Sequence, residues 1–154
     1  MESDRLDPRE ARRIAERAEA APYVDYPPTP WWYAPVVGLW SAALLLNLSL
    51  AGSHTAIAVP AILILVTLEG AAIGWYFRRY GAVPSMRRPP AEFRRALAGY
   101  AVGCLVVVAL VALAWHTTGP PVAALLAGVL VTIGLLVYER SYAAAARRTR
   151  DRLA

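Results

Sequence analysis

Glu69 is the residue of this 154-residue chain best placed to do chemistry, because it is the one charged side chain well inside a long apolar segment. Counting back from Arg78 along a helix places Glu69 about 13 Å inside that segment, near the midplane of a membrane. An ionised carboxyl group at that depth costs several kcal/mol, so an ion or proton site is the default hypothesis. Two alternatives stay open: a protonated Glu69 that bonds a neighbouring helix, and a partner protein that supplies the counter-charge.

Other polar side chains lie at the same depth if the apolar segments are helices that alternate in direction. Ser41, Cys104 and Thr132 lie about 10–12 Å inside their segments, and Tyr100 lies nearer the ends that carry arginines. We therefore expect Glu69 to face the interior of a bundle and to hydrogen-bond Thr132, Ser41 or Tyr100. The candidate proton, ion or interhelical polar site consists of Glu69, Ser41, Tyr100, Cys104 and Thr132.

His54 and His116 are the two histidines, and both lie at the ends of their segments opposite the arginines. A structural zinc site needs three or four ligands, and no Cys, Asp or Glu lies on that side. The sequence also lacks a phosphate-binding glycine loop, an HExxH motif and a GxSxG motif. We therefore expect no catalytic residue, no metal, no cofactor and no enzymatic activity.

Four long apolar segments dominate the composition. Hydrophobic residues make up 58% of the chain and charged residues 18%, against roughly 45–50% and about 25% in an ordinary soluble domain. The segments cover about 33–51, 55–77, 97–118 and 122–140, and about 20 apolar residues suffice to cross a bilayer as a helix. They predict an all-α integral membrane protein with four transmembrane helices in an up-down bundle. This excludes a soluble enzyme, a disordered protein and a disulfide-stapled domain.

All sixteen basic residues are arginines, and they flank the apolar segments at one side of the predicted membrane. They occur before the first segment, in the loop 78–96 and after the fourth segment, whereas the connections 52–54 and 119–121 have none. The positive-inside rule therefore places both termini and the loop in the cytoplasm. Arginine without lysine indicates a GC-rich bacterial genome, so we expect the cell inner (cytoplasmic) membrane. The basic tail 143–154 is expected to continue the fourth helix.

Arginines close to the predicted membrane surface are expected to contact anionic headgroups, each worth about 1 kcal/mol. These are Arg78, Arg79, Arg87, Arg88, Arg94, Arg95, Arg147 and Arg148. Since the positive-inside rule already explains these side chains, we expect no nucleic-acid partner. Large amphipathic rings are expected to anchor the chain at the same interface. These are Trp31, Trp32, Tyr33 and Trp75.

A polar extension, residues 1–30, precedes the transmembrane domain, residues 31–142. Asp7 suits the N-cap of a helix and Pro8 suits its first position, so a short helix is predicted from there to about Ala21. This helix has little apolar surface to bury. We therefore expect it to be solvated, with contact to the headgroups or to a partner as the alternatives.

Small residues spaced four apart predict where membrane helices pack closely. Such pairs are Gly70 and Gly74, Gly99 and Gly103, Gly38 and Ala42, and Ala124 and Gly128. The first two pairs form GxxxG motifs, in the second and third segments. The spacing is typical of close packing inside one bundle, or of the seam of a homo-oligomer.

The sequence favours a small polytopic bacterial membrane protein that acts as a non-catalytic structural, assembly or regulatory partner. The alternative is a small oligomeric proton-coupled transporter or channel that uses Glu69. In topology alone the chain resembles the small four-helix multidrug transporters, which also use one membrane-embedded glutamate. In those proteins the acid lies in the first helix and almost no polar extension precedes it, whereas here Glu69 lies in the second predicted helix.

Overall fold

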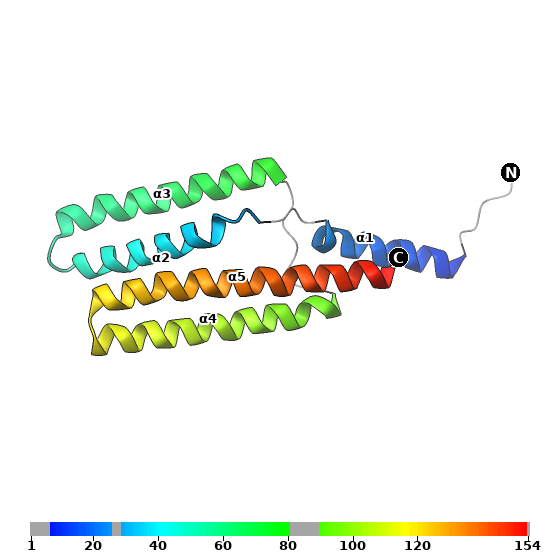
Figure 1. Cartoon of the computed structure of the whole chain (residues 1–154). Coiled ribbons are helices and arrows are strands. Elements are labelled where there is room, and N and C mark those ends of the chain that lie inside the picture. Colours follow the sequence, from blue (N-terminus) through cyan, green and yellow to red (C-terminus); the bar gives the residue numbers. More distant parts are fainter. Residues whose placement is uncertain (1–6, 26–28, 81–89, 154) are drawn as a thin grey trace.

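The computed structural model describes residues 7–25, 29–80 and 90–153, and the regular structure in these ranges is entirely α-helical. The helices are α1 (Pro8–Val24), α2 (Tyr33–Leu50), α3 (Thr55–Tyr80), α4 (Ala91–Thr117) and α5 (Pro120–Leu153). Four of them, α2 to α5, are long and apolar enough to span a membrane. The chain is therefore organised as a multi-pass membrane protein (Figure 1).

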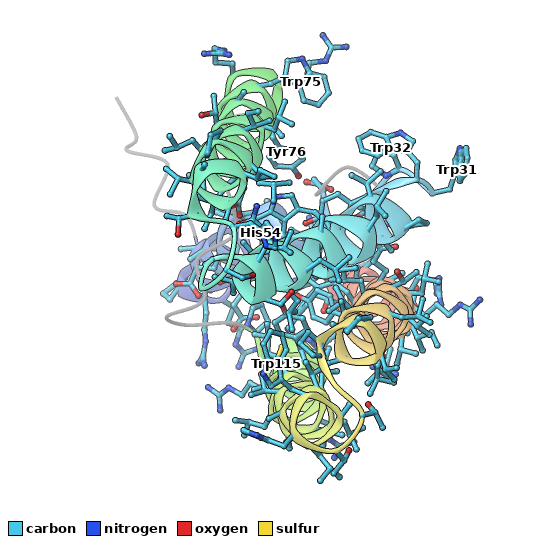
Figure 2. All side chains as sticks on the ribbon, turned by 90° about the vertical axis from the view of Figure 1, so that its left-hand side faces the viewer. Trp31, Trp32, His54, Trp75, Tyr76 and Trp115 are labelled. Atoms are coloured by element: carbon cyan, nitrogen blue, oxygen red, sulfur yellow. The ribbon has the colours of Figure 1, made fainter. Side chains whose placement is uncertain are left out.

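The four long helices form one open layer in the order α3, α2, α5, α4 (Figures 1 and 2). Most contacts join α2 to α5 and α4 to α5, and fewer join α2 to α3. Within the described ranges, the backbone of α3 lies next to that of α2 and not next to that of α4 or α5, although the Tyr76 side chain of α3 lies near Tyr142 of α5. One chain thus forms two antiparallel hairpins side by side, and the expected up-down bundle is not confirmed. Lipid chains are as apolar as the helices, so the hydrophobic effect does not force such a layer to close.

The centre of the layer is the crossing of α2 and α5, where small residues bring the two backbones together. A Cβ atom added at Gly38 would clash with the Thr132 hydroxyl and with the carbonyl oxygen of Gly128. A Cβ atom added at Gly128 would lie 3.2 Å from the Cβ of Ala42. Ala124, which lies about one turn before Gly128 in α5, is also buried. The two small-residue pairs predicted in the first and fourth segments are therefore confirmed as packing residues.

The outer helices contact the layer through fewer and larger side chains. The indole Nε1 of Trp40 on α2 donates to the carbonyl oxygen of Leu65 on α3 at 3.4 Å, and Ala58 of α3 is buried. At the other edge, the rings of Tyr100 on α4 and Tyr138 on α5 lie with their centroids 4.8 Å apart. Since each outer helix has one neighbour in the layer, most of its surface is exposed.

The helix α5 has 34 residues and is about 51 Å long, which exceeds the roughly 30 Å thickness of the hydrocarbon core. Its C-terminal part continues past the layer without a break, as expected for the tail (Figure 1). The helix α4 begins at Ala91, so it includes the residues that precede the third apolar segment. We call the end of the layer at which α2 and α4 begin the arginine-rich end.

The helix α1 packs on this projecting part of α5, so it is not simply solvated as we expected. Asp7 caps α1 as predicted and accepts from the Arg9 amide at 3.1 Å, but the helix continues past Ala21 to Val24. The residue that anchors it is Tyr23, which is 7% exposed. Sequence reasoning missed Tyr23, because three further residues of helix were needed to turn its ring onto α5.

A small hydrophobic core, the aromatic cluster, joins α1, α4 and α5 beyond the apolar segments. It consists of Tyr23, Phe93, Tyr142, Ala145 and Ala146. The Phe93 ring is fully buried, with its centroid 5.4 Å from that of Tyr23 and 4.8 Å from that of Tyr142. This cluster attaches the N-terminal helix to the start of α4 and to the projecting end of α5.

Candidate functional site

Glu69 is exposed on α3, and among the described residues it has no hydrogen-bond or ion-pair partner. Helical periodicity places it on the same stripe as Ala58 and Leu65, whose positions face α2. Two exposed apolar side chains, Val66 and Ile73, lie about one turn on either side of Glu69. The carboxyl group is therefore exposed on a side of α3 that turns partly toward α2, with apolar side chains next to it.

The structure does not assemble the predicted polar layer within one chain. The backbone of α3 lies next to that of α2 and not next to that of α4 or α5, and in the described ranges no hydrogen bond joins Glu69 to Tyr100, Cys104 or Thr132. The predicted hydrogen bond from Glu69 is wrong for a single chain. Counting residues gave the depth of these side chains but not which helices are neighbours.

Of the other members of the predicted site, Tyr100 and Cys104 hydrogen-bond each other on α4, whereas Ser41 and Thr132 bond backbone carbonyl groups. The Ser41 hydroxyl donates to the carbonyl oxygen of Val37 at 2.8 Å, and the Thr132 hydroxyl donates to that of Gly128 at 2.7 Å. Both bonds stay within their own helix. Tyr100 packs against α5, and Cys104 is exposed on α4.

The two GxxxG motifs are also open within one chain. A Cβ atom added at Gly70, Gly74, Gly99 or Gly103 would meet nothing within 4 Å. They therefore make no close contact within the described part of one chain, where the close crossing lies between α2 and α5, and their role in helix packing stays a prediction. In α3, Gly70 and Gly74 leave the backbone uncovered beside Glu69.

Two arginines cap the ends of α1 and α5 reciprocally. Arg17 of α1 donates from Nε and from one Nη to the carbonyl oxygen of Leu153 at 3.1 and 2.7 Å. Arg150 of α5 donates to the carbonyl oxygen of Val24 at 2.5 Å. The last carbonyl groups of a helix lack intrahelical donors and carry partial negative charge, so cations stabilise this position. The two helices thus each cap the other.

Further polar contacts connect α1, α4 and α5 near the aromatic cluster. Arg152 forms an ion pair with Glu92 at 2.8 Å, which joins α5 to α4. The Tyr142 hydroxyl donates to the carbonyl oxygen of Tyr23 at 3.1 Å. Burial raises the pKa of the Tyr142 phenol to about 12, so the hydroxyl keeps its proton in the physiological range.

Glu139 lies at the end of the fourth apolar segment, beside Arg140. Its Oε1 atom is buried without a hydrogen-bond partner, as is the Oε2 atom of Glu92. Nothing in the sequence indicates that one carboxyl oxygen of Glu139 or Glu92 is buried without a hydrogen-bond partner. Both groups lie near the arginine-rich end and not at the depth of Glu69.

The predicted interface anchors are exposed rings at the arginine-rich end. Trp31 is 85% exposed, and Trp32 and Trp75 also project outward (Figure 2). Tyr33 is exposed as well. This position suits a membrane–water interface, where an indole ring is stable between lipid and water.

The predicted lipid-contacting arginines fall into two groups. Arg78, Arg79, Arg94 and Arg95 are exposed beside the ends of α3 and α4. Arg147 and Arg148 are also exposed, but they lie on the projecting part of α5, about 14 Å past Tyr138 along the helix. Arg87 and Arg88 lie outside the described residues. Headgroup contact stays a prediction for all of these arginines. The first group lies closer to the predicted membrane surface than Arg147 and Arg148 do.

A metal site is not formed by the described part of the chain, where no three His, Cys, Asp or Glu side chains are grouped to bind an ion. His54 is exposed, and its Nδ1 atom lies 2.8 Å from the Ser53 hydroxyl oxygen. His116 is exposed near the end of α4. Neither histidine therefore adds to a candidate site.

Comparisons with protein-family models, curated proteins and solved structures find no match to this chain. Its function is therefore inferred from its own geometry. The feature that most needs an explanation is Glu69, a carboxyl group exposed on a helix that is apolar enough to cross a membrane.

Proposed function

We propose that this chain is a non-catalytic membrane protein that acts as an assembly or regulatory partner through lateral association of α3. One observation carries the proposal: α3 has one neighbour in the open layer and exposes Glu69 in its apolar segment. A carboxyl group that faces lipid costs several kcal/mol, and a polar contact from another helix offsets that cost. The uncovered backbone at Gly70 and Gly74 allows such a helix to approach closely.

The arginines support an orientation with both termini in the cytoplasm of a bacterial cell and with the layer in the inner membrane. The exposed arginines at the ends of α3 and α4 lie at the same end of the layer as the interface tryptophans. In this orientation α1 and the projecting part of α5 lie in the cytoplasm. They provide a second surface, which the aromatic cluster joins to the start of α4.

A proton-coupled transporter or channel, the alternative function, has weaker support. A proton path needs polar groups that exchange protons on both sides of the acid. The hydroxyl groups at the depth of Glu69, Ser41 and Thr132, already donate to carbonyl groups of their own helices. Nothing in the described residues extends from Glu69 toward either end of the layer as a chain of free polar side chains.

Photo-crosslinking in the native membrane tests the proposed function. A photo-reactive amino acid replaces Val66 or Ile73, which flank Glu69, or replaces Leu113 on the exposed surface of α4 as the matched control. We expect protein adducts of one defined mass from the α3 positions and lipid adducts alone from the α4 position. Lipid adducts alone at all three positions would contradict lateral association through α3.

A further inference from the structure

We propose that the partner of α3 is a transmembrane helix of a different protein that carries one arginine or lysine near the middle of the bilayer, paired with Glu69. This inference rests on the proposed function and names the chemistry of the occupant. It concerns α3 alone and leaves the contacts of α1, α4 and α5 unchanged.

The first step of the argument is the position of Glu69. Its carboxyl group is exposed, and it lies about 13 Å from Arg78 along α3, near half the thickness of the hydrocarbon core. Water and headgroups do not reach a side chain as short as glutamate from this depth. An ionised Glu69 therefore needs a cation within the membrane, where opposite charges attract far more strongly than in water.

The second step is that the chain cannot supply this cation itself. The four apolar segments, 33–51, 55–77, 97–118 and 122–140, contain no lysine and one arginine, Arg140, which lies at the arginine-rich end of the fourth segment and not at the depth of Glu69. A second copy of the chain therefore brings no positive charge to the depth of Glu69. The requirement points to a partner with a different sequence.

Neutral hydrogen-bond donors are what a second copy of the chain would have to offer in place of a cation. The hydroxyl groups near this depth are those of Ser41, Thr67 and Thr132. Each donates to a carbonyl group four residues earlier in its own helix, at 2.7–2.8 Å. Their protons are already used, and the thiol of Cys104 is a weak donor. A basic side chain from another protein would supply the polar partner for the Glu69 carboxyl group that these groups do not supply.

The fourth step is steric. A long basic side chain pairs with Glu69 only if the partner backbone lies close to α3. Gly70 and Gly74 have open space where a Cβ atom would stand, so a helix can approach there. Val66 and Ile73 give the partner apolar contacts on either side of the ion pair.

Energy transfer between the full-length chain and synthetic helices in liposomes tests the inference. The chain carries the donor dye on Ser53→Cys in a Cys104→Ala background. The acceptor is a leucine–alanine transmembrane peptide with arginine, glutamine or leucine at its centre. We expect the arginine peptide to bind at least tenfold more tightly than the leucine peptide, with the glutamine peptide between them.

Two variants of the chain make the test specific. Glu69→Gln should lower binding of the arginine peptide to the level of the leucine peptide, whereas Glu139→Gln, which removes a carboxyl group at the segment end, should leave it unchanged. Circular dichroism and thermal unfolding of both variants, expected to match the parent chain, establish that they fold. Equal binding of the arginine and leucine peptides, or full binding to the folded Glu69→Gln variant, would overturn the inference.

A third measurement tests whether the helix that packs on α3 comes from a second copy of the chain. Chains labelled with donor or acceptor report self-association, which should not depend on Glu69. Self-association that is lost in Glu69→Gln and is not displaced by the arginine peptide would overturn the inference in favour of a second copy. If protein crosslinks form at Val66 and Ile73 but the peptides show no preference for arginine, this inference alone is refuted. If no protein crosslinks form at these positions, the proposed function is refuted as well.

Discussion

At the residue scale, the crossing of α2 and α5 depends on the absence of a side chain at Gly38. The neighbouring Thr132 hydroxyl and Gly128 carbonyl occupy the space that a Cβ atom would need. The carbonyl oxygen belongs to the backbone, so it can move only if α5 itself moves. Gly38, at this close contact between α2 and α5, therefore cannot be replaced by a larger residue unless the helices move apart.

Gly38→Ala should destabilise the layer by about 1–3 kcal/mol, since overpacking forces the two helices apart. Thermal unfolding in mild detergent measures the change. Gly134→Ala on α5 is the matched control, because a Cβ atom there meets nothing within 4 Å. The control should be neutral or slightly stabilising, by up to about 1 kcal/mol from helix propensity. An equal effect of both variants would mean that the crossing is not close.

Phe93 is the side chain on which the aromatic cluster depends, because it is fully buried between Tyr23 and Tyr142. Phe93→Ala should cost about 3–5 kcal/mol of the cluster's stability, as for other buried aromatic residues. The release of α1 should appear as faster proteolysis at the N-terminal helix. Ile14→Ala, at a residue of α1 that is 51% exposed, should leave the proteolysis rate unchanged.

At the element scale, α1 is held at its C-terminal end and free at its N-terminal end. The aromatic cluster and the two arginine caps involve Arg17, Tyr23 and Val24 of this helix. The residues before Arg17 extend past the end of α5 (Figure 1). A helix with little apolar surface thus docks because both helix ends offer carbonyl groups to an arginine of the neighbouring helix.

Arg17→Ala and Arg150→Ala should each weaken the docking of α1 by about 0.5–1 kcal/mol, a modest effect because both side chains are exposed. Spin labels on α1 and on the projecting part of α5 should report a broader distance distribution. Arg13→Ala, at an exposed position of α1, provides the control. Unchanged distance distributions in the double variant would show that the caps do not hold α1.

At the scale of the whole molecule, the open layer and the arginine-rich end define two directions of contact. The layer exposes α3 and α4 at its edges within the membrane, and α5 carries α1 away from it (Figures 1 and 2). The proposed use of both directions depends on the orientation in the bilayer that the positive-inside rule predicts from the arginines.

Cysteine labelling in right-side-out membrane vesicles tests this orientation. In a Cys104→Ala background, a membrane-impermeant maleimide should label Ser53→Cys, in the turn between α2 and α3, and should not label Arg79→Cys. Permeabilised vesicles should allow both to react, which controls for buried thiols. The reverse pattern would place the termini outside and contradict the positive-inside assignment.

Much of the fold was predictable because it depends on local composition. The four long apolar helices follow from segment length, the start of α1 from Asp7, and the α2–α5 crossing from small residues spaced four apart. The candidate site was only partly predictable. The sequence identified Glu69 and its depth, but not its lack of a partner. The GxxxG motifs make no close contact within the described part of one chain.

The sequence by itself determined which segments are helices that can span a membrane, because length and apolarity act within each segment. The tertiary structure alone decided which helices are neighbours, that the layer stays open and that Tyr23 anchors α1. The physical reason is that, in lipid, helices select neighbours through a few close contacts and not through a general hydrophobic force. Glu69 is exposed because those contacts favour α5 as the main neighbour of α2 and leave α3 at the edge.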